Sequence, residues 1–313
     1  MNRDDLLTLA GFACLILVVP LFVRNEYFLH LLILGAFFAQ LAGYWNLLDG
    51  YLGLINFGYA AYIGIGAYTS ALLAIHFSLP IPVCMVLGGI AAGLIGILLI
   101  IPCLRMVTFS TAIVTLAFGE IARIVATAWT GLTKGEMGLW GIPPLFSSPK
   151  KLPFYYFIFG FLLLGTMVLR KILRSRLGLA IVAIREDEIA AATNGIETNR
   201  MKVLVSGISC FVAGVAGAFY AHYILTITPG LFGMGYTIQI MAMSMFGGKG
   251  TLAGPILGAF ALILFSEAFR FMQDYRLIVY GLLIIGTVLV FPTGLIGAVR
   301  RVTGAFRSKE VIS

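Results

Sequence analysis

Long apolar runs, separated by short polar or glycine-rich breaks, fill almost the whole chain. Because about 20 apolar residues cross a bilayer as a helix, these runs predict an all-α integral membrane bundle of about eight to ten transmembrane helices. The run at 235–247 is short and flanked by glycines, so a tilted, broken or half-inserted helix is an alternative there. The ten candidate spans are 5–23, 28–46, 54–75, 80–103, 107–130, 153–172, 202–223, 235–247, 254–271 and 277–298.

Two polar segments between these runs are long enough to hold structure of their own. They cover about 131–152 and about 173–201. With the N-terminus in the cytoplasm, most Lys and Arg residues fall in cytoplasmic segments, and 173–201 is one of them, as the positive-inside bias requires. An even number of spans then places both termini in the cytoplasm and 131–152 outside. We expect the whole chain, 1–313, to form a single transmembrane domain.

Composition supports this class. Of the 313 residues, 60% are hydrophobic and only 11% are charged, whereas a soluble domain carries about 25% charged residues. A soluble fold of this composition would expose large apolar patches, which excludes a soluble enzyme, a secreted scaffold and a disordered protein. The net charge of +8 is explained by basic loops beside anionic lipid. We therefore expect membrane lipid as a partner, and no nucleic acid.

The segment 173–201 predicts a short, capped helix. Asp187 suits the N-cap, and Glu188 suits the positive end of the helix dipole. Asn194 and Gly195 supply the left-handed residue that ends such a helix. A helix of this kind serves either as a connector lying on lipid head groups or as a docking surface for another protein.

The residues around this helix resemble a known family. Arg185-Glu-Asp-Glu-Ile-Ala-Ala-Ala-Thr-Asn-Gly-Ile196 is similar to the cytoplasmic loop of ABC importer permeases of the branched-chain amino acid type (LivM-like). The general importer motif differs in that Glu directly precedes the Ala pair, where Ile189 intervenes here. Lys134 also stands where the family has a small residue. Further blocks that match in the family's order are Asn46–Gly58, Gly64–Tyr68, Thr115–Arg123, Gly138–Pro143 and Gly247–Ala259.

The resemblance implies a membrane-spanning permease subunit of an ATP-driven importer in a bacterial inner membrane. The implied cargo is leucine, isoleucine and valine, with another amino acid, urea or a short amide as alternatives. The implied partners are a second homologous permease chain, two cytoplasmic ATP-binding subunits and an extracytoplasmic substrate-binding protein. ATP and Mg would bind the partner subunits, and this chain would bind no cofactor and perform no catalysis. The ATPase-coupling residues would be Arg185, Asp187, Glu188, Ile189, Ala190, Ala191 and Gly195.

Polar and small residues within the spans are candidates for the translocation pathway or for close helix packing. Glu120 and Arg123 are three residues apart on one predicted helix, so we favour an ion pair between them over direct substrate contact. Likeness between 50–68 and 247–259 hints at an inverted repeat, with tight helix packing an equal explanation. The remaining candidates are Asn46, Gly50, Gly53, Asn56, Gly58, Gly66, Gln239, Gly248, Gly250 and Gly254.

Other function classes find little support in the residues. The three histidines fall near predicted span ends and the four cysteines lie in apolar runs, so we expect no metal site and no disulfide framework. No Ser/His, paired-Asp or HExxH constellation suggests an intramembrane enzyme. A stand-alone secondary transporter is the alternative from a different class, but it leaves the capped helix after Asp187 without a role.

Overall fold

The computed structural model describes residues 25–106, 108–148 and 150–268. Within them, six helices are long and apolar enough to cross a membrane, in agreement with six of the predicted spans. The chain is therefore an all-α, multi-pass membrane protein. The six are α2 with its π-helical extension (Glu26–Asn46 and Leu47–Leu52), α3 (Tyr59–Phe77), α4 (Ile81–Cys103), α5 (Thr108–Ala128), α7 (Leu152–Leu173) and α10 (Thr198–Ile224).

Two shorter helices follow α10. They are α11 (Met234–Gly248) and α12 (Gly254–Ala268), of 15 residues each. At 1.5 Å per residue each is about 22 Å long, less than the hydrocarbon core of a bilayer. The prediction of a short helix at 235–247 is confirmed. The expected spans 5–23 and 277–298 lie outside the described residues.

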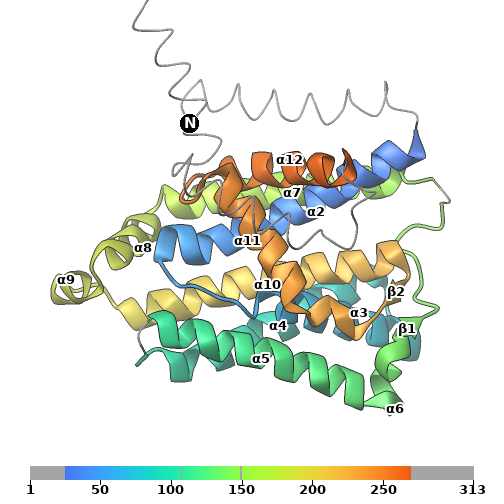
Figure 1. Cartoon of the computed structure of the whole chain (residues 1–313), viewed down its shortest axis with the longest axis horizontal. Coiled ribbons are helices and arrows are strands. Elements are labelled where there is room, and N and C mark those ends of the chain that lie inside the picture. The colour runs from blue at the N-terminus through green and yellow to red at the C-terminus, as the bar shows by residue number, and fades with distance from the viewer. Residues whose placement is uncertain (1–24, 107, 149, 269–313) are drawn as a thin grey trace, which may run out of the picture.

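Small elements gather at the two ends of the bundle (Figure 1). At one end lie α6 (Thr130–Thr133), the 3-10 turns Gly135–Met137 and Pro229–Phe232, and the strands β1 (Leu139–Trp140) and β2 (Thr226–Ile227), which pair antiparallel. At the other end lie α8 (Arg176–Glu186) and α9 (Glu188–Thr193). We call these the β1 end and the α9 end. The segments 131–152 and 173–201 therefore lie at opposite ends, as the alternation of spans predicts.

The helices α3, α4 and α10 pack with their backbones in contact. A Cβ on Gly66 of α3 would overlap the backbone of Gly214 on α10, and one on Gly88 of α4 would lie 2.6 Å from the carbonyl oxygen of Gly66. Lipid tails are as apolar as leucine, so helices in a membrane associate largely through such close van der Waals contact. The glycines thus set the spacing of this three-helix stack, and Gly66, a candidate for the pathway or for close packing, lies in a backbone contact.

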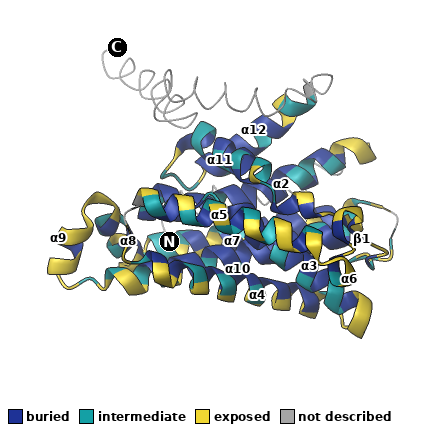
Figure 2. Ribbon diagram, turned by 60° about the horizontal axis from the view of Figure 1, so that its bottom comes forward, coloured by how far each residue is buried: buried dark blue, intermediate teal, exposed yellow. Residues whose placement is uncertain are grey.

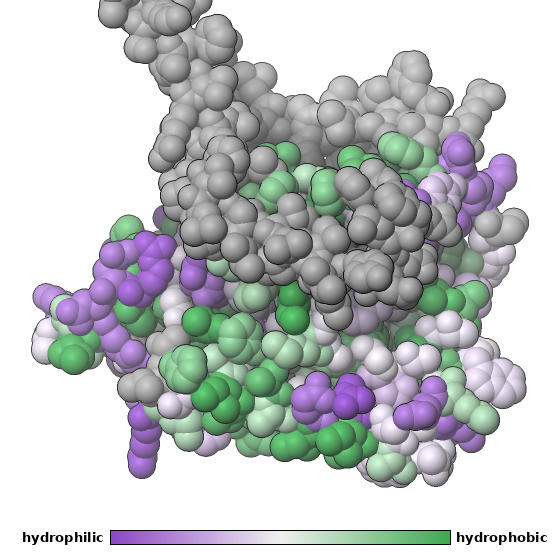
Figure 3. Space-filling view, viewed as in Figure 1, coloured by the Kyte–Doolittle hydropathy of each residue, from purple (hydrophilic) through white to green (hydrophobic). Residues whose placement is uncertain are grey.

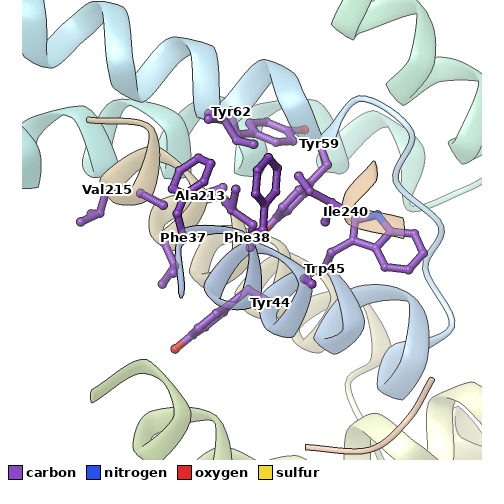
Figure 4. Close-up of a cluster of buried hydrophobic side chains, with 14 of the residues drawn as sticks. Phe37, Phe38, Tyr44, Trp45, Tyr59, Tyr62, Ala213, Val215 and Ile240 are labelled. Carbon is purple, nitrogen blue, oxygen red and sulfur yellow. The ribbon is translucent and has the colours of Figure 1, made fainter. Parts of the chain in front are cut away.

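The helix α2 lies between this stack and the layer that contains α7 and α12 (Figure 1). Its aromatic residues and those of α3 form a cluster in which every side chain is at most 5% exposed (Figure 4). The hydroxyl of Tyr44 donates to the carbonyl oxygen of Gly165 on α7 at 3.1 Å. The cluster comprises Phe37, Phe38, Tyr44, Trp45, Tyr59 and Tyr62. Its rigid rings fix α2 against both layers.

The backbone between α2 and α3 is not helical. Span 54–75 was expected to be continuous, but α3 begins only at Tyr59, because Gly53 at φ +78° ends the preceding turn. Non-helical backbone at membrane depth needs internal hydrogen-bond partners. Trp45 Nε1 donates to the backbone carbonyl oxygen of Asn56 at 3.0 Å, and the backbone amide of Phe57 donates to Thr115 Oγ1 at 3.1 Å. The break is thus a specific structure that other helices hold in place.

The outer faces of α4 and α5 are apolar and exposed (Figure 2). Buried residues concentrate in the middle of the bundle, and α5 is the least buried of the six long helices. Leu98 of α4 and Phe109 of α5 are 71% and 73% exposed. Such surfaces face lipid or another membrane chain. The cysteines at positions 84, 103 and 210 are free and buried, in agreement with the sequence.

Replacing Gly66 by leucine should disrupt the α3–α4–α10 stack. The added side chain meets the backbone of Gly214 on α10, which has nowhere to move, so we expect a loss of about 3 kcal/mol of stability or failure to fold. Thermal unfolding in detergent measures the effect. Gly160→Leu is the matched control, because a Cβ at Gly160 of α7 meets nothing within 4 Å. Equal stability of the two variants would contradict backbone contact as the basis of the stack.

Candidate functional site

The predicted capped helix is present as α9, Glu188–Thr193. Asp187 Oδ1 accepts hydrogen bonds from the amides of Ile189 and Ala190, both at 2.9 Å, so the predicted N-cap is confirmed. Gly195 has φ +84°, and a Cβ at this position would meet nothing within 4 Å. Glycine is therefore needed here for the left-handed backbone conformation and not for close packing. Short local signals therefore define this helix completely.

One side of α9 is attached to the bundle and the other is free. Lys202 of α10 donates to Glu188 Oε1 at 2.5 Å, and Ala191 is buried. Ile189 is 78% exposed. Ile189 is therefore the apolar side chain that α9 presents away from the bundle.

The sequence did not predict α8, which precedes α9 and connects it to α2. Ser175 Oγ accepts from the Leu177 amide at 3.2 Å and caps α8. In its last turn, Arg185 pairs with Glu186 and its Nη1 donates to the oxygen of Gly50 at 2.8 Å. Gly50 lies in the π-helical turn at the end of α2. A residue of the predicted coupling segment is therefore bonded directly to a membrane helix.

The same π turn is bonded to the turn between α11 and α12. Asn46 Nδ2 donates to the backbone carbonyl oxygen of Thr251, and the backbone amide of Gly250 donates to Asn46 Oδ1, both at 2.9 Å. Lys249 Nζ lies 2.8 Å from Asp49 Oδ2, and the Asp49 side chain is only 5% exposed. We call these contacts, together with the bond from Arg185 to Gly50, the α9-end network.

Glycines make this network compact. A Cβ on Gly50 would overlap Asn46 Oδ1 and lie 2.8 Å from the Gly250 amide nitrogen. Gly53, Gly248 and Gly250 have positive φ angles, which L-residues rarely adopt. Gly254 begins α12, and its amide donates to Thr251 Oγ1 at 3.1 Å. The two glycine-rich blocks of the sequence thus meet at Gly50 and Gly250, and the inverted repeat between them stays a prediction.

The structure does not gather the predicted pathway residues into one lining. Asn56 lies buried in the break before α3, and Gly58 abuts the carbonyl of Thr115 on α5. Gln239 is buried on α11, and its Nε2 has no hydrogen-bond partner within the described part of the chain. Their role in translocation stays a prediction, whereas the close contact predicted at Gly58 is confirmed.

The predicted pair on α5 is confirmed. Arg123 Nε donates to Glu120 Oε2 at 2.8 Å, and the two side chains are 43% and 41% exposed. Figure 3 shows a hydrophilic patch within the apolar band over α5. Contact with lipid tails is costly for such groups. Pairing of the two side chains with each other lowers that cost.

Two features escaped the sequence analysis. The partners of Asn46 and Asp49 lie 200 or more residues away in the sequence and leave no trace in local spacing. His222 was expected to pack near a span end, yet it is fully buried, 2.9 Å from Ser70 Oγ and 2.7 Å from the oxygen of Pro143. In the described residues, no group of three or more His, Cys, Asp or Glu side chains is arranged to hold a metal ion.

Comparisons with known proteins agree with this architecture. Residues 27–288 match the family model for the permease component of branched-chain amino acid transport systems. The high-affinity branched-chain amino acid permease protein LivM of Escherichia coli is 32% identical over an alignment of 282 positions, which covers 82% of this chain and 66% of LivM. LivH of Salmonella typhimurium is 27% identical, over 84% of this chain and 92% of LivH.

A more distant relative has a different named cargo. The autoinducer 2 import permease protein LsrC of Klebsiella pneumoniae is 28% identical over an alignment of 194 positions, which covers 55% of each chain. No solved structure is significantly similar to the chain.

Asn46→Ala should destabilise the α9-end network. It removes both bonds to the α11–α12 turn and leaves the Gly250 amide without its acceptor, a loss of about 1–3 kcal/mol. Thermal unfolding of the purified chain measures it. Asn199→Ala, at an exposed position in the first turn of α10, is the control and should change stability by no more than about 0.5 kcal/mol. If both variants unfold alike, the bonds of Asn46 do not stabilise the fold.

Proposed function

This chain belongs to the permease-component family of branched-chain amino acid transport systems, and we propose that it is one membrane-spanning subunit of an ATP-driven importer for leucine, isoleucine and valine. The observation that carries the proposal is α9. This capped helix presents Ile189 to solvent, while its neighbour Arg185 is bonded to the end of α2. Such an arrangement suits the transfer of a partner's motion into the membrane part.

The proposed complex contains a second, homologous permease chain, two cytoplasmic ATP-binding subunits and an extracytoplasmic binding protein. ATP and Mg bind the ATP-binding subunits and not this chain. We propose a bacterial inner membrane, with both chain termini in the cytoplasm and the whole chain forming one permease domain.

The charge distribution supports this orientation. Of the described basic residues, most lie toward the α9 end, and Lys134, Lys150 and Lys151 lie toward the β1 end. The positive-inside bias therefore favours a cytoplasmic position for α9. The basic residues toward the α9 end are Arg105, Arg170, Lys171, Arg174, Arg176, Arg185, Arg200, Lys202 and Lys249.

Coupling in this proposal proceeds from α9 to the pathway through the α9-end network. The ATP-binding subunits move α9, Arg185 transmits the movement to the π turn of α2, and Asn46 and Asp49 pass it to the α11–α12 turn. The π turn suits this step because π-helical turns are rare and occur frequently at functional sites. The contacts of Asn46 and Asp49 then differ between the inward-open and outward-open states. A partner shifts this equilibrium only through its differential affinity for the two states.

The α5 face with Glu120 and Arg123 is the proposed boundary of the pathway toward the second permease. A half-exposed ion pair at this depth is unfavourable against lipid but suits a water-filled path or a polar subunit interface. The apolar residues around it, such as Ile121 and Ile124, suit a membrane-embedded partner. Asn56 and Gly58 lie on the opposite, inner side of α5, where Gly58 contacts the α5 backbone.

Changing Ile189 to aspartate tests the docking role. The side chain is free in the isolated chain, so folding should be unaffected, while binding of the ATP-binding subunits should weaken at least about tenfold through lost apolar burial. Affinity purification of the tagged chain, with its retained partners quantified, measures this. Met137→Asp is the control, because Met137 is 88% exposed at the β1 end. A solitary wild-type chain that transports cargo without ATP-binding partners would establish a stand-alone transporter instead.

Arg185→Ala separates coupling from docking. The variant keeps the exposed face of α9, so ATP-binding subunits should still bind, but transport per ATP hydrolysed should fall about tenfold, as expected when a charged hydrogen bond is lost. Transport and ATP hydrolysis in proteoliposomes give this ratio. Arg200→Ala is the control, because Arg200 is 79% exposed and, among the described residues, pairs only with its helix neighbour Glu197. An unchanged ratio in Arg185→Ala would rule out the proposed route.

A further inference from the structure

A cavity lies at the β1 end of the bundle, far from the α9-end network. It has a volume of about 520 Å³ and opens where the N-terminal ends of α2 and α7 meet the C-terminal end of α10. Aromatic side chains form one wall and two lysines stand at the rim. The proposed transport mechanism uses none of these residues.

The aromatic wall is a well-packed structure. His30 of α2 and Tyr223 of α10 stack, and their side chains are joined by a hydrogen bond of 2.6 Å. Phe154 of α7 contacts Tyr223 at a centroid distance of 5.2 Å, and Phe146 stands edge-on to Phe154 at the same distance. Helices α2, α7 and α10, together with the loop before α7, therefore hold a fixed apolar surface for a ligand.

The polar groups at the rim are those that an anion requires. Lys150 and Lys151 line the cavity together with two serines, and no carboxylate is among the lining residues. Lys151 Nζ donates to the backbone oxygen of Glu26 at 3.3 Å, and neither lysine forms an ion pair within the described part of the chain. Glu26 and Glu267 are near this region but outside the lining. The lining therefore carries positive charge with hydroxyl donors beside it.

The cavity lies at the level expected for lipid head groups. The apolar spans of α2 and α7 begin at Glu26 and Leu152, directly beside it. Tyr27 and Tyr156 are 40% and 39% exposed near these helix ends, as in the aromatic belts at membrane interfaces. Lysines at such positions extend their ammonium groups to the head-group region. A ligand here has its polar part at the interface and its apolar part along the helices.

We propose that this cavity binds an anionic phospholipid. The phosphodiester group lies between Lys150 and Lys151, and the glycerol and first acyl carbons lie against Phe154 and Tyr223. The cavity is on the α2–α7 side of the bundle, whereas α5 runs along the opposite side (Figure 1). The bound lipid therefore serves as a fixed component of the α2–α7–α10 junction and not as cargo.

Lipid titration of the purified full-length chain tests the site. In detergent, phosphatidylglycerol should raise the unfolding temperature more than phosphatidylcholine, and native mass spectrometry should show one retained phosphatidylglycerol. The double variant Lys150→Gln/Lys151→Gln should weaken this binding roughly 25-fold, about fivefold for each lysine. Lys134→Gln, a basic residue at the same end but outside the cavity, is the control and should bind like the wild type.

Further measurements distinguish a lipid from a soluble phosphate as the bound anion. Glycerophosphoglycerol, which keeps the phosphodiester of phosphatidylglycerol without its acyl chains, should neither displace the lipid nor stabilise the chain at millimolar concentration. Full effect of glycerophosphoglycerol would identify a soluble phosphate ester as the ligand and overturn the lipid assignment. Unchanged lipid retention in the double variant would overturn the site itself. The site would also be overturned if the double variant lost affinity for an external binding protein and still bound lipid normally, because the lysines would then contact a protein.

Discussion

Everything in this structure depends on how closely α3, α4 and α10 approach one another. Within a bilayer, burial of apolar side chains gives helices little reason to associate, because the lipid is equally apolar. Gly66, Gly88 and Gly214 remove the side chains that would hold the backbones apart. The stack they form is a rigid base, on which α2, α11 and α12 are held by hydrogen bonds and aromatic contacts.

The contrast between the rigid stack and the hydrogen-bonded helices around it explains which part of the chain can change conformation. The stack is held by dense backbone contact between glycines, whereas the α9-end network consists of a few hydrogen bonds and the ion pair between Lys249 and Asp49. Arg185, Gly50, Asn46 and Asp49 lie in series between an exposed helix and two membrane helices. Hydrogen bonds can exchange between discrete partners at low cost, so a network of this kind suits an element that alternates between two states. The non-helical backbone before α3, held by Trp45 and Thr115, adds a second such element near the middle of the bundle.

The sequence predicted the features whose causes are local. Apolar run length placed six long helices and identified α11 as short, and the Asp187 cap and Gly195 placed both ends of α9. The pair Glu120–Arg123 was predictable because both residues lie on one helix three positions apart. Contacts between distant segments were not predictable. Nothing beside Asn46 or Asp49 indicates that their partners are Thr251 and Lys249, and the break before Tyr59 depends on side chains from other helices.

The central claim is that the exposed face of α9 binds an ATP-binding subunit. A photoreactive amino acid at position 189, activated in native membranes, tests this without purification or loss of weak partners. The account predicts a covalent adduct with a soluble ATP-binding chain, and none from the same probe at position 137 at the opposite end. Adducts with lipid alone at position 189 would show that α9 lies on the membrane surface, and would contradict the account.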